Sequence, residues 1–179
     1  MTLEIIKYPN PLLARKSHKA VINAELETLV HNMLDTINAF KEPQAAGLSA
    51  IQLGIPVQVL IARDFAVSSA RDAQGHTTVT THDFILINPK FVSIAPEKDL
   101  DWEGCLSFPD MYGKVWRAKK VKLKYQDLAG NAQRLTASAF LARVIQHEMD
   151  HLAGITFNTK IVGKTYTGAE LDTTTKVVD

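Results

Sequence analysis

The segment His147-Glu148-Met149-Asp150-His151 carries residue types that can bind and use a metal ion. Residues four apart on an α-helix lie about 40° apart around the axis and about 6 Å apart along it. His147 and His151 can therefore bind one ion from a single helical face, and Glu148 can exchange a proton with a water at that ion without being a ligand. The pattern predicts a metal-dependent hydrolase with Glu148 as its acid or base. The alternative is a solvated helix with incidental histidines.

A catalytic zinc-type centre needs a third protein ligand and one position open for water. Some zincin peptidases place a histidine six residues after the second one, but here that position is Phe157. Others use a downstream glutamate, for which Glu170 in the Thr-rich tail is the candidate. The single cysteine, Cys105, is the stronger candidate, because a thiolate beside a divalent cation is deprotonated and binds it strongly. The opposing interpretation of Cys105 is a small buried hydrophobic residue.

Two helices are predicted from apolar residues at three- and four-residue spacing. The first covers 24–40, with Asn23 as its N-cap. The second covers 138–153, with Ser138 as its N-cap and Gly154 as its C-terminal stop. This second helix would present the two histidines.

Short β-branched or alternating runs predict strands at 57–61, 84–87 and 121–125. The turn residues at 127–131 predict a hairpin after the last of these. Helices and strands in this order indicate an α+β domain.

The whole chain, 1–179, is expected to form a single catalytic domain. The polar stretch 63–83 is predicted to be a long exposed loop, and 163–179 a flexible tail. Lys plus Arg number 20 against 19 for Asp plus Glu, so the net charge of +1 gives no electrostatic case for nucleic acid or a membrane as partner. One cysteine and no signal or transit segment favour a bacterial-type cytoplasm.

Three blocks of this sequence together resemble the peptide deformylase family. They are Ala46–Gly54, Glu103–Ser107 and Gln146–Gly154, and they occur in the order typical of that family. The first block departs from the family pattern Gly-x-Gly-x-Ala-Ala-x-Gln at Ala45 and Ser49. Both replacements are small, so we expect a slightly altered pocket wall with activity retained.

The resemblance implies a fold with mixed or antiparallel strands packed around a central helix that carries the His-Glu-x-x-His motif. It also implies roles for individual residues, which are Cys105, His147 and His151 as metal ligands, Glu148 as catalytic acid/base, and Gln52 with the backbone N–H of Leu106 as the oxyanion hole. Without the other blocks, Gln52 would be read as an ordinary polar residue at a helix or loop edge. Glu103 would pair with Arg117 as structural support.

The substrate implied by the resemblance is the N-formylmethionyl end of a nascent peptide, which would lose formate. Gly47 and Gly104 would hold it as an added strand, although simple turn geometry also explains both glycines. Phe140 and Val144 precede His147 on the same helix and would line the methionine pocket, unless they are core residues.

Fe²⁺ is the cofactor that the resemblance favours, while Zn²⁺, Ni²⁺ or Co²⁺ suit the same ligands in purified samples. The end of the chain, 171–179, is not basic, so any ribosome contact is expected to be transient. Two rival interpretations remain. One is a zincin-like metallopeptidase with Glu170 as third ligand, and the other is a catalytically inactive deformylase-like module.

Overall fold

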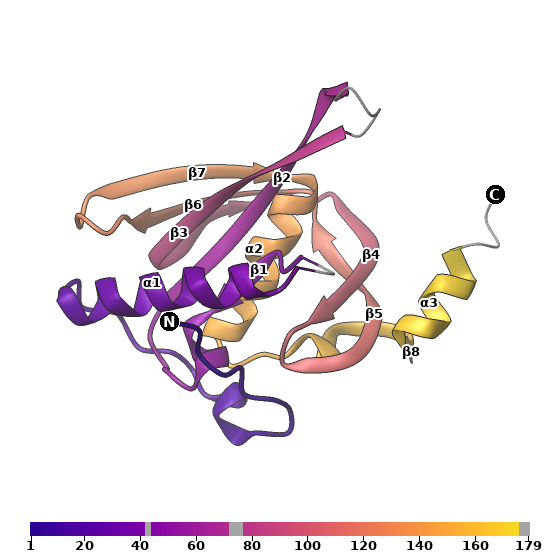
Figure 1. Cartoon of the computed structure of the whole chain (residues 1–179), viewed down its shortest axis with the longest axis horizontal. Coiled ribbons are helices and arrows are strands. Elements are labelled where there is room, and N and C mark those ends of the chain that lie inside the picture. The colour runs from indigo at the N-terminus through magenta and orange to yellow at the C-terminus, as the bar shows by residue number, and fades with distance from the viewer. Residues whose placement is uncertain (42–43, 72–76, 176–179) are drawn as a thin grey trace.

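The computed structural model describes every residue except 42–43, 72–76 and 176–179. Its helix α2 lies in the middle of the molecule, with a larger antiparallel sheet on one side and a smaller one on the other (Figure 1). No helix of the described part is long and apolar enough to span a membrane. The elements in chain order are η1 (Pro11–Ala14), α1 (Ala24–Ala39), β1 (Gly47–Ser49), η2 (Ala50–Leu53), β2 (Val59–Arg71), β3 (Thr77–Ile94), β4 (Lys98–Cys105), β5 (Phe108–Ala118), β6 (Lys120–Gln126), β7 (Ala132–Ser138), α2 (Ala139–Leu152), η3 (Phe157–Lys160), β8 (Ile161–Tyr166) and α3 (Gly168–Thr175).

The larger sheet has the strand order β1-β2-β3-β6-β7, and all of its neighbouring strands run antiparallel. Its centre is apolar, because Leu60 and Ile61 of β2 and Leu86 and Ile87 of β3 are fully buried. The short strand β1 forms one edge of this sheet. Its unpaired edge is therefore free to bind another extended chain.

The smaller sheet has the order β4-β5-β8 and is also antiparallel. A tight turn joins β4 to β5, with Cys105 paired to Phe108 across it. The strand order makes β4 an edge strand, like β1 in the larger sheet. The last residue of β4, Cys105, lies at the turn.

Helix α1 forms as its apolar stripe predicts. The side chain of Asn23 accepts a hydrogen bond from the N–H of Leu26, which caps the first turn. Val30, Met33 and Ile37 are fully buried in the cluster that α1 shares with β1 and β2. The predicted helix is confirmed to within one residue of its end.

Helix α2 begins after Ser138 and ends before Gly154, whose φ of 75° is the left-handed conformation typical of a helix stop. Ala142 and Ile145 are fully buried against the larger sheet. Packing on this side fixes the rotation of the helix about its axis. The opposite side, with His147 and His151, is directed toward the smaller sheet.

The predicted loop at 63–83 is wrong. β2 continues to Arg71 and β3 begins at Thr77, so the two strands form a long hairpin. Threonine and valine are β-branched and favour strands even where they are exposed, and the run 77–81 contains only these residues. A polar stretch therefore did not indicate a loop here; only 72–76 lie outside the described residues.

The flexible tail predicted from residue 163 is also corrected. Strand β8 pairs with β5, and helix α3 follows it. Gly168 N–H donates to Asp110 across 2.7 Å, which attaches the start of α3 to β5. The last residues, 176–179, lie outside the described part. The α+β class and the predicted strands and hairpin are confirmed.

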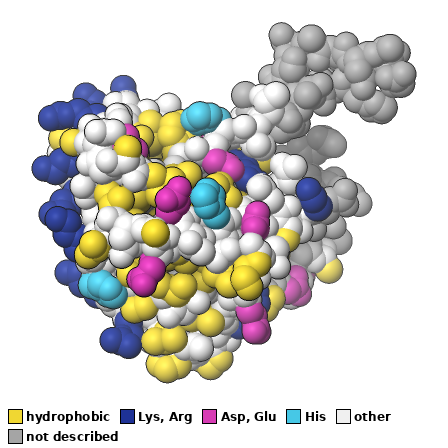
Figure 2. Space-filling model, turned by 60° about the vertical axis from the view of Figure 1, so that its left-hand side comes forward, with side chains coloured by type: hydrophobic (Ala, Val, Ile, Leu, Met, Phe, Trp, Pro, Cys, Tyr) yellow, Lys and Arg dark blue, Asp and Glu magenta, His cyan; other side chains and the backbone are white. Residues whose placement is uncertain are grey.

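Lysine and arginine side chains gather along the left-hand edge of the view in Figure 2. On the larger sheet, Lys90 of β3 is opposite Lys124 of β6, which is opposite Arg134 of β7. All three side chains are exposed, and none has an ion-pair partner among the described residues. Like charges directly opposite one another destabilise a sheet.

Candidate metal centre

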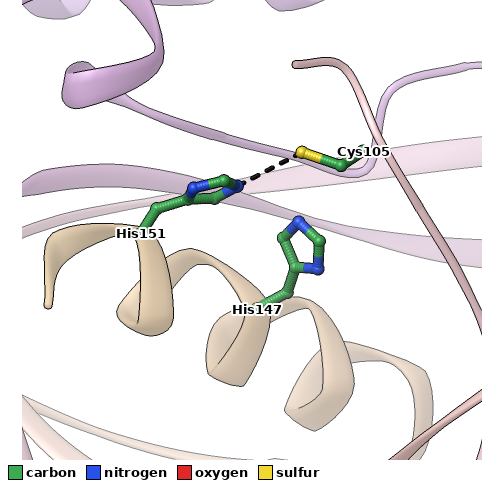
Figure 3. A group of neighbouring side chains, drawn as sticks. All are labelled: Cys105, His147 and His151. Carbon is green, nitrogen blue, oxygen red and sulfur yellow. Dashed lines mark hydrogen bonds between the residues drawn. The ribbon is translucent and has the colours of Figure 1, made fainter. Parts of the chain in front are cut away.

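His147 and His151 lie one turn apart on α2, with ring centroids separated by 5.0 Å. Both rings are buried. Figure 3 shows them directed from one face of the helix toward Cys105. The sulfur of Cys105, at the end of β4, is 3.3 Å from Nε2 of His151.

The three side chains meet the requirements of a metal site. One ligand atom from each of Cys105, His147 and His151 lies within 4.8 Å of the others, and no other group of three such residues was found in the described part of the chain. Tetrahedral ligands at ordinary zinc distances place sulfur and nitrogen about 3.6 Å apart. One thiolate and two imidazoles therefore fit a divalent ion with little adjustment.

Glu170 does not belong to this group. It is an exposed residue of α3, and its carboxylate accepts hydrogen bonds from the N–H and hydroxyl of Thr167 at 2.7 and 3.1 Å. Phe157, at the other position required by zincin patterns, is buried and packs against the His147 ring at 5.8 Å. The zincin interpretation therefore lacks a third ligand in this structure.

His147 is held by Glu103, a carboxylate outside the group that could hold a metal ion. Its Nδ1 lies 2.9 Å from Oε2 of Glu103, which leaves Nε2 for an ion. Arg117 donates two hydrogen bonds to the same carboxylate, at 2.8 and 3.0 Å, as expected for this pair. Arg143 adds a third at 3.0 Å.

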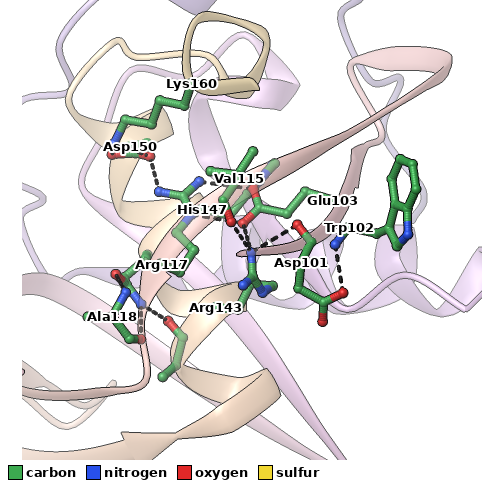
Figure 4. A network of polar contacts seen from close by, with 12 residues as sticks. Asp101, Trp102, Glu103, Val115, Arg117, Ala118, Arg143, His147, Asp150 and Lys160 are labelled. Atoms are coloured by element: carbon green, nitrogen blue, oxygen red, sulfur yellow. Dashed lines mark hydrogen bonds and ion pairs between the residues drawn. The ribbon is translucent and has the colours of Figure 1, made fainter. Parts of the chain in front are cut away.

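Figure 4 shows this carboxylate inside a buried network of charges. Arg117 also pairs with Asp150 of α2, which in turn binds Lys160. Burial alone would raise the pKa of Glu103, but the hydrogen bonds from Arg117 and His147 lower it to about 2. Glu103 is therefore ionised, and its negative charge is compensated by buried cations.

The two histidines have different electrostatic surroundings. Burial and the neighbouring His147 lower the pKa of His151 well below its ordinary value, so this ring is the neutral form that binds metals. Burial also acts to lower the pKa of His147, but the contacts with Cys105 and Glu103 raise it well above its ordinary value. A metal ion at the site must therefore displace a proton.

Glu148 is buried and lies beside the candidate metal ligands. Burial raises the pKa of its carboxyl above the ordinary value, while His147 and the hydrogen bond from Ser49 act in the opposite direction. Its Oε2 accepts the Ser49 hydroxyl at 2.6 Å, and a methyl group at Gly47 would overlap Oε1. The carboxylate is thus confined between α2 and β1.

Gln52 is buried in η2, between β1 and the Cys105 turn. Its Oε1 accepts the N–H of Ser49 at 2.9 Å, so its NH₂ group must be the end that faces the site. That nitrogen lies 3.6 Å from the sulfur of Cys105 and 3.3 Å from Oγ of Ser107. The amide can therefore donate a hydrogen bond to a molecule bound beside Cys105.

Leu106 follows Cys105 in the turn between β4 and β5. Its carbonyl accepts a hydrogen bond from Nζ of Lys7 at 2.6 Å. Its N–H has no partner among the described residues. This peptide group is held by its oxygen, which leaves its N–H as an available donor.

A pocket of about 430 Å³ opens beside these groups. The two edge strands border it, β1 through Gly47 and β4 through Gly104. Phe140 and Val144 both line it. Phe140 is half exposed and so is not a core residue, whereas Val144 is buried and belongs to the core as well. The pocket therefore brings all of the predicted substrate-contact residues to one place.

Sequence reasoning missed several residues of this site. Ser49 was expected only to alter the pocket wall, but it binds Glu148. Arg143 and Asp150 lie four residues before and three after His147, so helical spacing could have placed them on the same side of α2. Lys7 had no signal of this kind, because its contact with Leu106 joins distant parts of the chain.

The fold and the site define a metal-dependent hydrolase. A family model described as polypeptide deformylase matches residues 2–166, so the chain belongs to that family. Its members remove the N-formyl group from nascent peptides.

Individual relatives agree with this assignment. The chain is 39% identical to a peptide deformylase of Helicobacter hepaticus, over 89% of this chain and 83% of the relative. It is 38% identical to that of Campylobacter jejuni, over 90% and 87%. A Met-Ala-Ser-bound peptide deformylase of Acinetobacter baumannii is 30% identical and superposes with a TM-score of 0.75, over 90% of this chain and 99% of that one. The Thermotoga maritima enzyme is 27% identical, with a TM-score of 0.74 over 91% and 99%.

Proposed function

We propose that Cys105, His147 and His151 hold one divalent ion, with Fe²⁺ as the favoured metal. Zn²⁺, Ni²⁺ and Co²⁺ suit the same ligands, so a purified sample can carry any of them. The convergence of these three side chains beside Glu148 is the observation that carries the proposal. When bound, the ion would supply a more acidic water and polarise the formyl carbonyl.

Glu148 serves as the acid/base of the reaction. Its carboxylate takes a proton from the attacking water and passes it to the nitrogen that leaves when the formyl C–N bond breaks. The water oxygen ends in formate, and the peptide gains a free methionine N-terminus. Burial supports this role, because it raises the pKa of the carboxyl toward the range in which it can both accept and return a proton.

Gln52 and Leu106 stabilise the charge that develops on the formyl oxygen. Ser49 fixes the Gln52 amide with its NH₂ group toward the site, and the Leu106 N–H is an available donor. Both donors are in place before substrate binds, so little energy is spent on reorganising them. Loss of one such donor lowers kcat by about 10²- to 10³-fold in other enzymes.

The formylated peptide lies as an extended strand between the edges of β1 and β4. Gly47 and Gly104 contribute backbone groups, and side chains there would collide with Glu148 and Tyr112 respectively. Phe140 and Val144 line the part of the pocket that takes the methionine side chain. The Met-Ala-Ser bound by the Acinetobacter relative is the product of such a substrate.

The enzyme acts in a bacterial-type cytoplasm, where newly made chains carry the formyl group. Its contact with the ribosome is transient. Neither nucleic acid nor membrane is required for the reaction.

The test is formate release from formyl-Met-Ala-Ser by anaerobically prepared Fe²⁺ protein. Cys105→Ala should lose both metal and activity, and Glu148→Gln should keep the metal but lose activity by about 10²- to 10⁴-fold. Glu170→Gln is the matched control and should behave as wild type. Activity that depends on Glu170 and survives Cys105→Ala would favour a zincin-like peptidase. If metal-loaded wild type releases no formate, the remaining interpretation is a catalytically inactive deformylase-like module.

A further inference from the structure

Ser49 contacts both of the polar side chains that are proposed to act on the substrate. Its hydroxyl lies 2.6 Å from Oε2 of Glu148, and its N–H donates to Oε1 of Gln52 at 2.9 Å. We propose that Ser49 is a positioning residue, whose hydroxyl holds Oε2 of Glu148 and leaves Oε1 directed toward the pocket. The inference rests on the proposed role of Glu148 as the acid/base.

Two hydrogen-bond acceptors lie within reach of the Ser49 hydroxyl. Besides the carboxylate, the backbone carbonyl of Glu148 lies 3.1 Å from Oγ of Ser49. A hydroxyl has one proton to donate, and a bond to a charged oxygen is shorter and about twice as strong as one to a neutral oxygen. The shorter distance is the one to Oε2. Ser49 therefore donates to the carboxylate while that group is ionised.

The other carboxylate oxygen of Glu148 remains available for proton transfer. Oε1 of Glu148 lies against Gly47, and no residue of the described part donates a hydrogen bond to it. Glu148 lines the pocket, whereas Ser49 is fully buried behind it. Bulk water cannot replace the serine hydroxyl, so its removal leaves Oε2 without a hydrogen-bond donor among the described residues and loosens the orientation of the carboxylate.

The expected effect is modest, because Ser49 is not the only constraint on Glu148. The carboxylate also lies against Gly47, so Ser49 improves the orientation of Glu148 and is not essential to it. We therefore expect Ser49→Ala to lower kcat by about fivefold, less than the full value of a hydrogen bond to a charged group. KM should be unchanged, because Ser49 does not border the pocket.

The experiment compares metal-loaded wild type, Ser49→Ala and Ser17→Ala on formyl-Met-Ala-Ser. Ser17 is the matched control, because it is also a buried serine, and its hydroxyl has no hydrogen-bond partner among the residues that the structure describes. A fall in kcat of about twofold or more with constant KM and metal content, absent from Ser17→Ala, supports the proposal. A smaller fall, an equal fall in Ser17→Ala, or an effect confined to KM overturns it.

A second measurement avoids catalysis and uses metal-free protein. In denaturant unfolding, Ser49→Ala should lower the midpoint more in the wild-type background than in a Glu148→Ala background, where the hydroxyl can donate only to the backbone carbonyl of residue 148. Equal shifts in both backgrounds would show that the hydroxyl does not act through Glu148, and would overturn the proposal. If Glu148→Gln keeps full activity, the proposed function itself fails, which is a different outcome from wild-type behaviour of Ser49→Ala alone.

Discussion

The carboxylate of Glu103, at the end of β4, lies 2.9 Å from Nδ1 of His147 in the middle of α2. This contact joins the two parts of the molecule that supply the proposed metal ligands. The same carboxylate is bound by Arg117 and Arg143, so the orientation of His147 depends on a buried network as well as on its helix.

Glu103→Gln is expected to weaken metal binding by about 10- to 100-fold, because it removes the charge that orients and polarises the imidazole. It should also cost about 3–5 kcal/mol of stability, because two buried arginines lose their partner. Metal titration and denaturant unfolding measure the two effects. Glu97→Gln, a change at an exposed glutamate, is the control, and equal behaviour of the two variants would contradict the prediction.

Gly47→Ala is expected to lower kcat strongly and leave the metal in place. The added methyl group would overlap Oε1 of Glu148, and the carboxylate must then move away from the pocket. A displacement of about 1 Å in such a group costs about 100-fold in rate. Steady-state kinetics with parallel metal analysis tests this prediction. A wild-type kcat would show that a methyl group at position 47 does not displace the Glu148 carboxylate.

Metal binding should stabilise the fold. A ligand that binds only the native state at 100 times its dissociation constant contributes about 2.7 kcal/mol, which corresponds to roughly 5–10 °C in Tm for a chain of this size. Thermal unfolding with added Zn²⁺ and with chelator measures this difference. Cys105→Ser should reduce it sharply, and an equal response in that variant would place the metal elsewhere.

Lys124→Thr is expected to stabilise the protein by about 0.5 kcal/mol at low salt, because Lys124 lies between Lys90 and Arg134 on the sheet. The gain should shrink in 1 M salt, where the charges are screened. Urea unfolding at two salt concentrations tests this. A gain that does not change with salt would reflect strand propensity alone.

The sequence by itself was sufficient for the local features of this protein. Apolar spacing and capping residues predicted α1 and α2 almost to the residue, since the signals of a helix lie within a few turns. The spacing of His147 and His151 predicted a shared helical face for the same reason. The strand segments 63–71 and 77–83 were missed, because their polar sequence lacks the regular alternation of apolar and polar residues that identifies a strand.

Only the tertiary structure decided which distant residues meet. Cys105 and His151 are 46 positions apart, and Ser49 and Glu148 are 99 apart, so no local pattern relates either pair. Their contacts depend on how the turn after β4 and the end of β1 pack against α2. That packing is determined by burial of apolar surface throughout the core, which acts without regard to separation along the chain. The sequence therefore predicted the chemical groups of the site, and the fold determined their geometry.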